Sequence, residues 1–321
     1  MSDLLVRCMR RLAGWPLRRL HALGAPLGWL AYLGSPSYRR RFRANAAQAG
    51  VPWREARAAV AAAGRLMMEL PPMWLRPPGA PLPMPVHWEG EALLRRALGA
   101  GRGLVLLTPH MGCFEAAGQS YAERYGASLG PMTVLYRPAR KPWLRELVDR
   151  ARRRPQLDAA PATLAGVRQM MRALKRGEVV GLLPDQVPPD GQGVWAPFFG
   201  RPASTRTHAA RLVQQTGAAL LLQWAERLPR GAGYRVRVEP FGEPLPAEPE
   251  AAAAAINRAM ERLIRQCPQQ YLWGYHRYKA PRRASRAAAR EAAAASATAG
   301  AGDAPGAQEA RTPGARTGGA G

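Results

Sequence analysis

Short apolar runs alternate with segments of helical periodicity along most of the chain. The apolar runs are rich in Leu and Val and have the length of strands buried on both faces. They cover residues 103–108, 133–136, 178–183, 218–224 and 234–239. Segments with helical periodicity cover residues 51–76, 91–100, 114–125, 142–153, 163–176, 205–216 and 250–266. This alternation predicts an α/β fold with a largely parallel sheet.

The N-terminal part of the chain has a different pattern. Residues 20–38 contain no Lys or Arg, and arginines flank them at 18–19 and 39–43. Their length approaches the ~20 apolar residues that span a bilayer. His21, Pro26 and several glycines make a shallow or re-entrant anchor an equal alternative, and an ordinary buried helix a third. We therefore predict an N-terminal membrane-associated helix whose basic flanks face anionic cytoplasmic lipid.

The C-terminal part has the composition of a disordered tail. Residues 281–321 consist mainly of Ala, Gly, Arg, Thr and Pro, with almost no large apolar side chain. Such a segment cannot bury enough apolar surface to fold. The predicted organisation is thus a membrane anchor with a basic flank over 1–45, an α/β domain over 46–280 and a disordered tail over 281–321.

Charge and cysteine usage narrow the classes of partner. The formal net charge is +25, and nearly all of the positive charge comes from Arg. Such a field attracts nucleic acid, anionic lipid or acidic proteins without choosing among them. The three cysteines are far apart. This favours a reducing compartment and excludes a disulfide scaffold, and the histidines lack metal-ligand spacing.

Polar residues follow three of the predicted strands directly. His110, Arg137 and Asp185 each come just after an apolar run. Ligands of open α/β sheets bind at the carboxyl ends of strands, so a base, a cation and a carboxylate converge if these strands are neighbours. Taken singly, each residue also has a plainer explanation, as a turn residue or a solvated arginine.

His110 and Glu115 are candidates for a base oriented by a carboxylate. Five positions along one helix correspond to a rotation of ~140°, which separates the two side chains. They can meet if His110 lies in the Pro/Gly turn before the helix and Glu115 in its first turn. Glu115 would then accept a hydrogen bond from one ring nitrogen and leave the other as a base. The alternative is that Glu115 only complements the helix dipole.

Two other motifs lie in the wrong structural context for the functions that their patterns suggest. Residues 126–130 match the serine-hydrolase pattern G-x-S-x-G, but that elbow joins a strand to a helix and this one joins a helix to a strand. The glycines at 99–103 precede their strand, whereas a dinucleotide-binding loop follows one. Neither a serine nucleophile nor a nucleotide site is predicted.

Several blocks together resemble the bacterial lipid A biosynthesis acyltransferases, within the lysophospholipid acyltransferase superfamily. The blocks are H-M-G-C-F-E at 110–115, Y-R-P at 136–138, L-P-D-Q at 183–186 with the segments 193–200 and 203–205, and Y-L-W-G-Y-H-R-Y-K at 271–279. The likeness extends over residues 4–280. Cys113 stands where Asn is usual in that family, and the pair Gly274-Tyr275 before His276 is also unusual.

The resemblance implies a reaction and the residues that carry it. His110 would deprotonate an acceptor hydroxyl, with Glu115 fixing its tautomer, and both are predicted to be catalytic. Arg137, Asp185 and Gln186 are predicted to bind substrate. The implied donor is an acyl thioester on acyl carrier protein or coenzyme A, with no cofactor, no metal and no nucleic acid.

The resemblance also implies an acceptor and a location. The acceptor would be a hydroxyl of a lipid A precursor, with a lysophospholipid or another glycolipid or aminolipid as alternatives. The implied location is the cytoplasmic face of the bacterial inner membrane. A non-enzymatic basic membrane-binding protein is the alternative of a different class.

Overall fold

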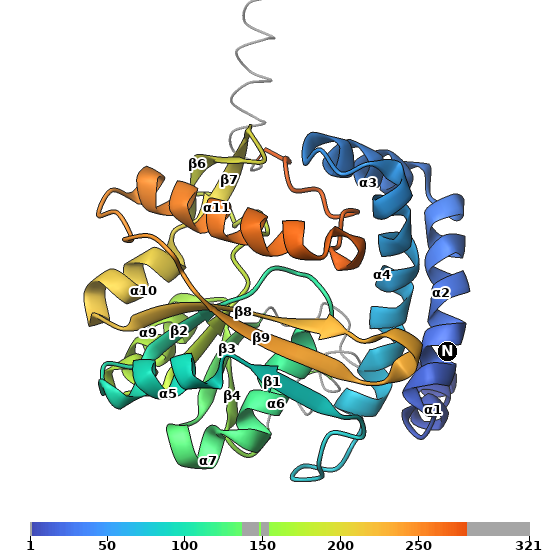
Figure 1. Cartoon of the computed structure of the whole chain (residues 1–321), viewed down its shortest axis with the longest axis horizontal. Helices are drawn as coiled ribbons and strands as arrows, with labels where there is room; N and C mark the ends of the chain where they lie inside the picture. The colour runs from blue at the N-terminus through green and yellow to red at the C-terminus, as the bar shows by residue number, and fades with distance from the viewer. Residues whose placement is uncertain (1, 137–147, 149–153, 281–321) are drawn as a thin grey trace, which may run out of the picture. The chain divides into compact units, whose positions relative to one another are not determined.

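A seven-stranded sheet forms the centre of the fold (Figure 1). The structure, a computed structural model, describes residues 2–136, 148 and 154–280. In spatial order the strands are β1 (Val86–Glu89), β9 (Tyr234–Pro240), β8 (Ala219–Arg227), β2 (Leu104–Leu107), β5 (Val179–Leu182), β3 (Met132–Tyr136) and β4 (Leu157–Pro161). Neighbouring strands are parallel except β8 and β9. The sheet is therefore mixed but mostly parallel.

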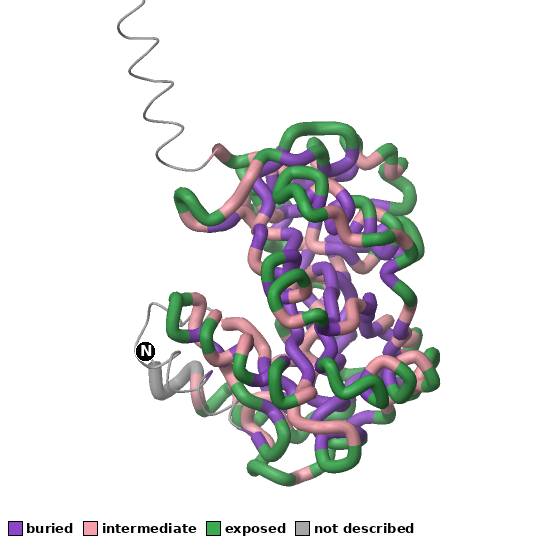
Figure 2. Tube along the Cα trace, turned by 90° about the vertical axis from the view of Figure 1, so that its left-hand side faces the viewer, coloured by how far each residue is buried: buried purple, intermediate pink, exposed green. Residues whose placement is uncertain are grey.

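The middle strands are buried on both faces. In β2, Leu104 and Leu106 pack into one hydrophobic cluster, and Val105 and Leu107 pack into another. Strands covered on both sides have no polar face, and this explains their continuous apolar runs. The buried trace runs through the middle of the fold in Figure 2, with exposed residues on the outer turns.

Helices cover both faces of the sheet. One hydrophobic cluster joins β2, β5 and β8 to α9 (Leu164–Lys175), α10 (His208–Thr216) and α11 (Pro249–Gln266). The other joins the opposite face to α5 (Glu91–Gly99), α6 (Phe114–Arg124) and the short α7 (Gly126–Leu129). A separate hairpin of β6 (Gly193–Phe198) and β7 (Arg201–Arg206) packs against α11. Two short 3₁₀ helices, η1 (Pro229–Gly231) and η2 (Pro268–Gln270), complete the elements.

The predicted α/β fold is confirmed, and so are the five predicted strands. Within the described ranges, four further strands were not predicted: β1, β4, β6 and β7. The two in the large sheet are its edge strands, and each is only half buried. Helix α10 begins at His208 rather than at 205, because the preceding residues form β7. The predicted helix over 142–153 falls almost wholly outside the described residues.

The N-terminal region forms four consecutive helices. They are α1 (Ser2–Ala13), α2 (Leu17–Gly34), α3 (Pro36–Gln48) and α4 (Trp53–Trp74). The apolar stretch over 20–38 is therefore broken at Ser35, whose hydroxyl accepts a hydrogen bond from the Tyr38 N–H and caps α3. Across the described part of the chain, every helix is too short or too polar to cross a membrane.

Helices α2 and α4 approach each other through glycine. A Cβ at Gly64 would collide with the backbone of Gly24 and Gly28, and a Cβ at Gly28 would collide with the Val60 carbonyl. The two helices lie side by side in Figure 1. Absence of side chains at these positions lets the backbones touch, as small residues do in tightly packed helix pairs.

We expect Gly64→Ala to lower the free energy of unfolding by about 1–3 kcal/mol, the usual cost of forcing atoms into a packed interface. Gly34→Ala is the matched control, because a Cβ at that helical position would meet nothing within 4 Å. It should be neutral or stabilising, as Ala is favoured over Gly in helices. Urea unfolding of both variants measures the difference. Equal effects would contradict the close approach.

Candidate active site

His110 and Asp185 meet because their strands are paired in register. Leu107 of β2 is the partner of Leu182 of β5, and each polar residue lies three positions beyond its strand end. His110 Nδ1 lies 2.6 Å from Asp185 Oδ1. The His110 backbone N–H also donates to Asp185 Oδ2 at 2.9 Å. The carboxylate thus fixes both the ring and the backbone of the histidine.

The environment keeps Asp185 ionised. The side chain is 1% exposed, and burial by itself opposes ionisation. Charge interaction with His110, hydrogen bonds from its ring and backbone, and the charge of Arg277 outweigh burial, and the pKa of Asp185 lies below its ordinary value. An ionised Asp185 accepts a hydrogen bond from His110 Nδ1–H, and in that tautomer Nε2 carries the lone pair.

Tyr271 provides a third contact to Asp185. Its hydroxyl donates to Oδ2 at 3.2 Å. Burial, together with the negative charge of Asp185, raises the pKa of Tyr271 well above its usual value. Tyr271 therefore remains a hydrogen-bond donor. The sequence placed it in the closing block of the resemblance but gave no sign of this contact.

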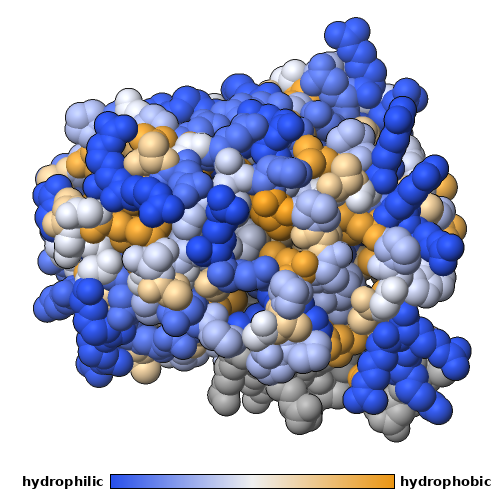
Figure 3. Space-filling model, turned by 60° about the horizontal axis from the view of Figure 1, so that its bottom comes forward, coloured by the Kyte–Doolittle hydropathy of each residue, from blue (hydrophilic) through white to orange (hydrophobic). Residues whose placement is uncertain are grey.

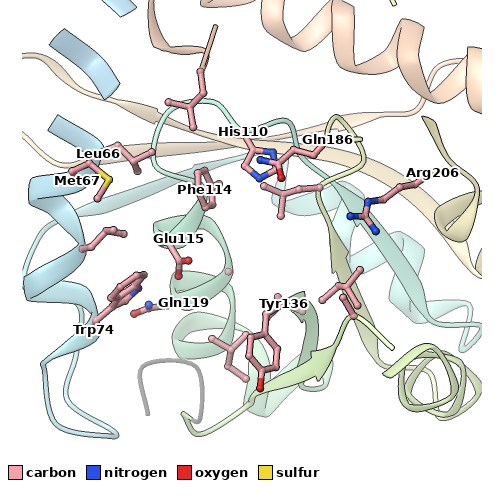
Figure 4. A pocket seen from close by; sticks show the side chains of 18 residues that line it. Leu66, Met67, Trp74, His110, Phe114, Glu115, Gln119, Tyr136, Gln186 and Arg206 are labelled. Carbon is pink, nitrogen blue, oxygen red and sulfur yellow. The ribbon is translucent and has the colours of Figure 1, made fainter. Parts of the chain in front are cut away.

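Glu115 lies in the first turn of α6, as predicted, but it is not the carboxylate bonded to His110 Nδ1. The partner of His110 Nδ1 is Asp185 and not Glu115, because strand pairing brings Asp185 to that nitrogen first. Glu115 lies in the first turn of α6, and its side chain lines a pocket together with His110 and Gln186 (Figure 4). Arg137 lies outside the described residues.

This pocket is a cavity of about 450 Å³. Its walls are mostly apolar and come from α4, α6 and the strand ends: Leu66, Met67, Leu70, Trp74, Phe114, Gly118, Val134, Leu135, Leu157, Ala162, Leu183 and Leu272. Its polar lining consists of His110, Glu115, Gln119, Tyr136, Gln186 and Arg206. Mainly apolar walls with a few polar groups are typical of ligand sites. Arg206, at the end of β7, was not among the predicted site residues.

The loop that carries His110, residues 108–113, is here called the histidine loop. The Gly112 N–H donates to the Gln270 carbonyl at 3.0 Å, and the Cys113 N–H donates to the Ala225 carbonyl at 2.9 Å. Gly112 has φ +59°, and a Cβ there would collide with the Ala225 carbonyl. The loop is therefore held between β8 and the last residue of η2.

The closing block, residues 271–279, supports the site from behind. The buried Arg277 guanidinium donates to the Ser204 carbonyl at 2.6 Å and to the Thr205 hydroxyl at 2.8 Å. The unusual Gly274 has a packing reason, because the ring of Tyr38 occupies the space that a side chain would need. These residues connect β7 and α3 to the segment that carries Tyr271.

Metal ligation finds no basis in the described residues. Across 2–136, 148 and 154–280, no three or more His, Cys, Asp or Glu side chains gather in a way that could hold a metal ion.

The fold and the site define an α/β protein with a histidine–carboxylate pair beside an apolar pocket. The chain belongs to the bacterial lipid A biosynthesis acyltransferase family, whose model matches residues 4–280. The resemblance noted in the sequence is thereby confirmed.

Known relatives match over part of their length. The chain is 31% identical over 192 residues to the lipid A biosynthesis palmitoleoyltransferase of Escherichia coli K12, covering 60% of each protein. It is 29% identical over 183 residues to the lipid A biosynthesis lauroyltransferase of the same organism, covering 56% of each. A lipid A biosynthesis acyltransferase of Haemophilus influenzae is 25% identical over 183 residues, or 56% of this chain and 55% of that protein. The matches thus span less than two thirds of these relatives.

The low pKa of Asp185 predicts a pH dependence of stability. A carboxyl with a folded-state pKa below its ordinary value of 3.8 adds stability above that pH and loses it as the pH falls through the folded value. We expect Asp185→Asn to be less stable than wild type near neutral pH and to lose less stability on acidification to about pH 3. Urea unfolding of both proteins at several pH values measures how the free energy of unfolding changes with pH. If both proteins lost the same amount of stability on acidification, Asp185 would not be ionised in the folded protein as described.

Proposed function

We propose that this protein transfers a fatty acyl chain from an acyl thioester to a hydroxyl group of a lipid A precursor. The observation that carries the proposal is the hydrogen-bonded pair of His110 and Asp185 at the wall of an apolar cavity. The pair supplies a base for the hydroxyl, and the cavity suits a hydrocarbon chain. Family membership and the activities for which the relatives are named support the same reaction.

The proposed reaction begins with transfer of the proton of the acceptor hydroxyl to His110. His110 Nε2 takes the proton of the acceptor hydroxyl while that oxygen attacks the thioester carbonyl carbon. A carbon–oxygen bond forms, the carbon–sulfur bond breaks, and the leaving thiolate takes the proton back from the imidazolium. Asp185 stabilises the imidazolium and holds the ring in its tautomer, as an orienting carboxylate does in catalytic triads.

Glu115 and its helix act on the substrate side in this proposal. Helix α6 begins at Phe114, directly after the histidine loop, and the Phe114 ring lies 5.2 Å from that of His110, so the positive end of the helix dipole lies near the base. That field favours negative charge on the thioester oxygen during attack. Glu115 lines the pocket, where its carboxylate would stabilise the positive charge that develops on His110.

The donor we propose is acyl carrier protein, with acyl coenzyme A as the alternative. The net charge of +25 draws an acidic protein to the surface and increases its association rate. Polar residues Gln186 and Arg206 give the pocket groups that bind the polar parts of donor or acceptor. Arg137 remains a predicted substrate-binding residue.

We further propose that the N-terminal helices bind the cytoplasmic face of the inner membrane. On α2, Leu30 is 64% and Leu33 is 60% exposed, with Leu27 one turn earlier also exposed. Trp53 and Met67 of α4 are exposed as well. On the face in Figure 3, hydrophobic side chains gather between hydrophilic ones. Apolar side chains beside arginines suit an interfacial helix on anionic lipid.

The reaction is tested with purified full-length protein, labelled acyl donors and a set of acceptors. We expect transfer from acyl carrier protein to a lipid A precursor, and His110→Ala to lower kcat at least ~100-fold, as for loss of a general base. Asp185→Asn should lower kcat at least as far as ~100-fold, because it favours the wrong tautomer. Glu115→Gln should have a lower kcat than wild type, while its free energy of unfolding at neutral pH stays unchanged.

Leu164→Asn is the control for these activity measurements, because this exposed residue of α9 lies outside the pocket lining. Full activity of His110→Ala would overturn the proposal. Transfer only to a lysophospholipid or another glycolipid would overturn the proposed acceptor but keep the reaction.

Membrane binding is tested by flotation with vesicles of phosphatidylglycerol or phosphatidylcholine. We expect binding to phosphatidylglycerol, weakened at high salt, and lost in Leu30→Glu/Leu33→Glu because two apolar contacts become charged. Leu164→Glu is the matched control, since Leu164 is 67% exposed on α9, away from the N-terminal helices. Equal flotation of both variants would contradict the proposed surface.

A further inference from the structure

A buried charged cluster lies beside the site and has no role in the proposed chemistry. Glu69 of α4 is 0% exposed, and Arg227, at the end of β8, is nearly as buried. Arg227 Nε and Nη2 donate to the two carboxylate oxygens of Glu69, the second at 2.8 Å. His21 of α2 lies with Nε2 2.6 Å from Glu69 Oε1. Three elements far apart in the sequence thus meet at one carboxylate.

Arg227 also reaches the histidine loop. Its Nη2 donates to the Gly112 carbonyl at 3.2 Å, two residues after His110. Gln270 forms hydrogen bonds with both Arg227 and Gly112. Its side chain accepts from the Arg227 N–H at 2.9 Å and donates to the Arg227 carbonyl at 3.0 Å, while its carbonyl accepts from the Gly112 N–H. The guanidinium therefore joins Glu69 directly to the backbone that carries the base.

Glu69 is equally well placed with respect to the pocket. Leu66 and Leu70, three positions before and one after it on α4, line the cavity next to His110. One carboxylate on α4 therefore fixes the distance between an apolar wall of the pocket and the histidine loop. The close backbone contact of α2 with α4 places His21 against the same carboxylate.

Stability alone does not explain the cluster. Burial opposes ionisation of Glu69, and Arg227 and His21 overcome this, so the pKa of Glu69 lies below its usual value. Even so, apolar residues of similar size often stabilise a protein as well as a buried ion pair does. What apolar residues cannot do is donate to the Gly112 carbonyl and fix the loop in one direction.

We propose that Glu69 and Arg227, braced by His21, are positioning residues that hold the His110 loop against the pocket wall formed by α4. The proposal rests on the proposed acyl transfer and adds the residues that set its geometry. They act through the Gly112 backbone and the α4 wall, without touching the reacting atoms. A displacement of about 1 Å at a catalytic group can cost ~100-fold in rate.

The experiment separates folding from positioning with single and double variants. Glu69→Gln and Arg227→Gln each leave a buried group without its partner, and both should lower the free energy of unfolding and kcat. The double variant Glu69→Leu/Arg227→Met removes both charges and should recover most of the stability. We expect its kcat to stay at least ~10-fold below wild type, with KM for the acyl donor within ~3-fold, because the loop is no longer held.

Arg227→Lys decides the question if the double variant does not fold. It keeps the positive charge but loses the planar fork that bonds Glu69 and Gly112 together, so kcat should fall by ~10-fold or more while the protein remains folded. Arg237→Gln is the control, because it breaks partly exposed ion pairs to Glu226 and Glu89 on the two neighbouring strands. Its kcat and stability should be close to wild type.

The possible results distinguish a positioning role of the cluster from a purely structural one, and both from failure of the proposed function. A double variant, or Arg227→Lys, with wild-type kcat and KM would overturn the positioning role and leave the cluster purely structural. Absence of acyl transfer in the wild-type protein would instead overturn the proposed function. A kcat that stays low after stability is recovered supports the positioning role.

Discussion

The parallel pairing of β2 with β5 is the constraint on which the site depends. Both strands are buried along their whole length, so their register is fixed by packing on two faces at once. His110 and Asp185 leave these strands in the same row, and the short contact between ring and carboxylate follows. A slip of one residue would turn every side chain of the strand to the other face and separate the pair. The apolar core and the polar chemistry are therefore two results of one register.

The same register places His110 beyond the end of β2, in a loop without regular secondary structure. Beyond Thr108 the chain makes only isolated bridges, so the polar backbone groups of the loop must find scattered partners. They find them at Ala225, Gln270 and the Arg227 side chain, and Gly112 adopts a left-handed conformation to reach them. Since Arg227 in turn needs Glu69, the buried ion pair and the irregular loop require each other. The N-terminal helix α2 is connected to this support through the contact of His21 with Glu69.

The sequence predicts the parts of this arrangement that local patterns encode. Strands buried on both faces show as Leu- and Val-rich runs, and His110 and Asp185 stand visibly at their ends. The edge strands β1 and β4 were missed because half burial gives short, mixed patterns. The partner of His110 was assigned to Glu115 since a spacing of five residues is visible in a sequence, whereas a register between strands 75 residues apart is not. Glu69 looks like any acidic residue of an amphipathic helix, and only the packing of α2 and β8 against α4 reveals that it is buried.

The two carboxylates near His110 differ in what they can reach, and this decides their roles. Asp185, predicted to bind substrate, is 1% exposed between His110 and Tyr271 and is not part of the pocket lining. It can act only through the histidine, by holding the Nδ1 proton and the positive charge of the ring. Glu115 lines the cavity itself, where a substrate would lie. In the proposed mechanism, the carboxylate that orients the base and the carboxylate that faces the substrate come from different elements, one from strand pairing and one from the first turn of a helix. The short motif that contains His110 and Glu115 therefore encodes only half of the site, and the other half depends on the sheet.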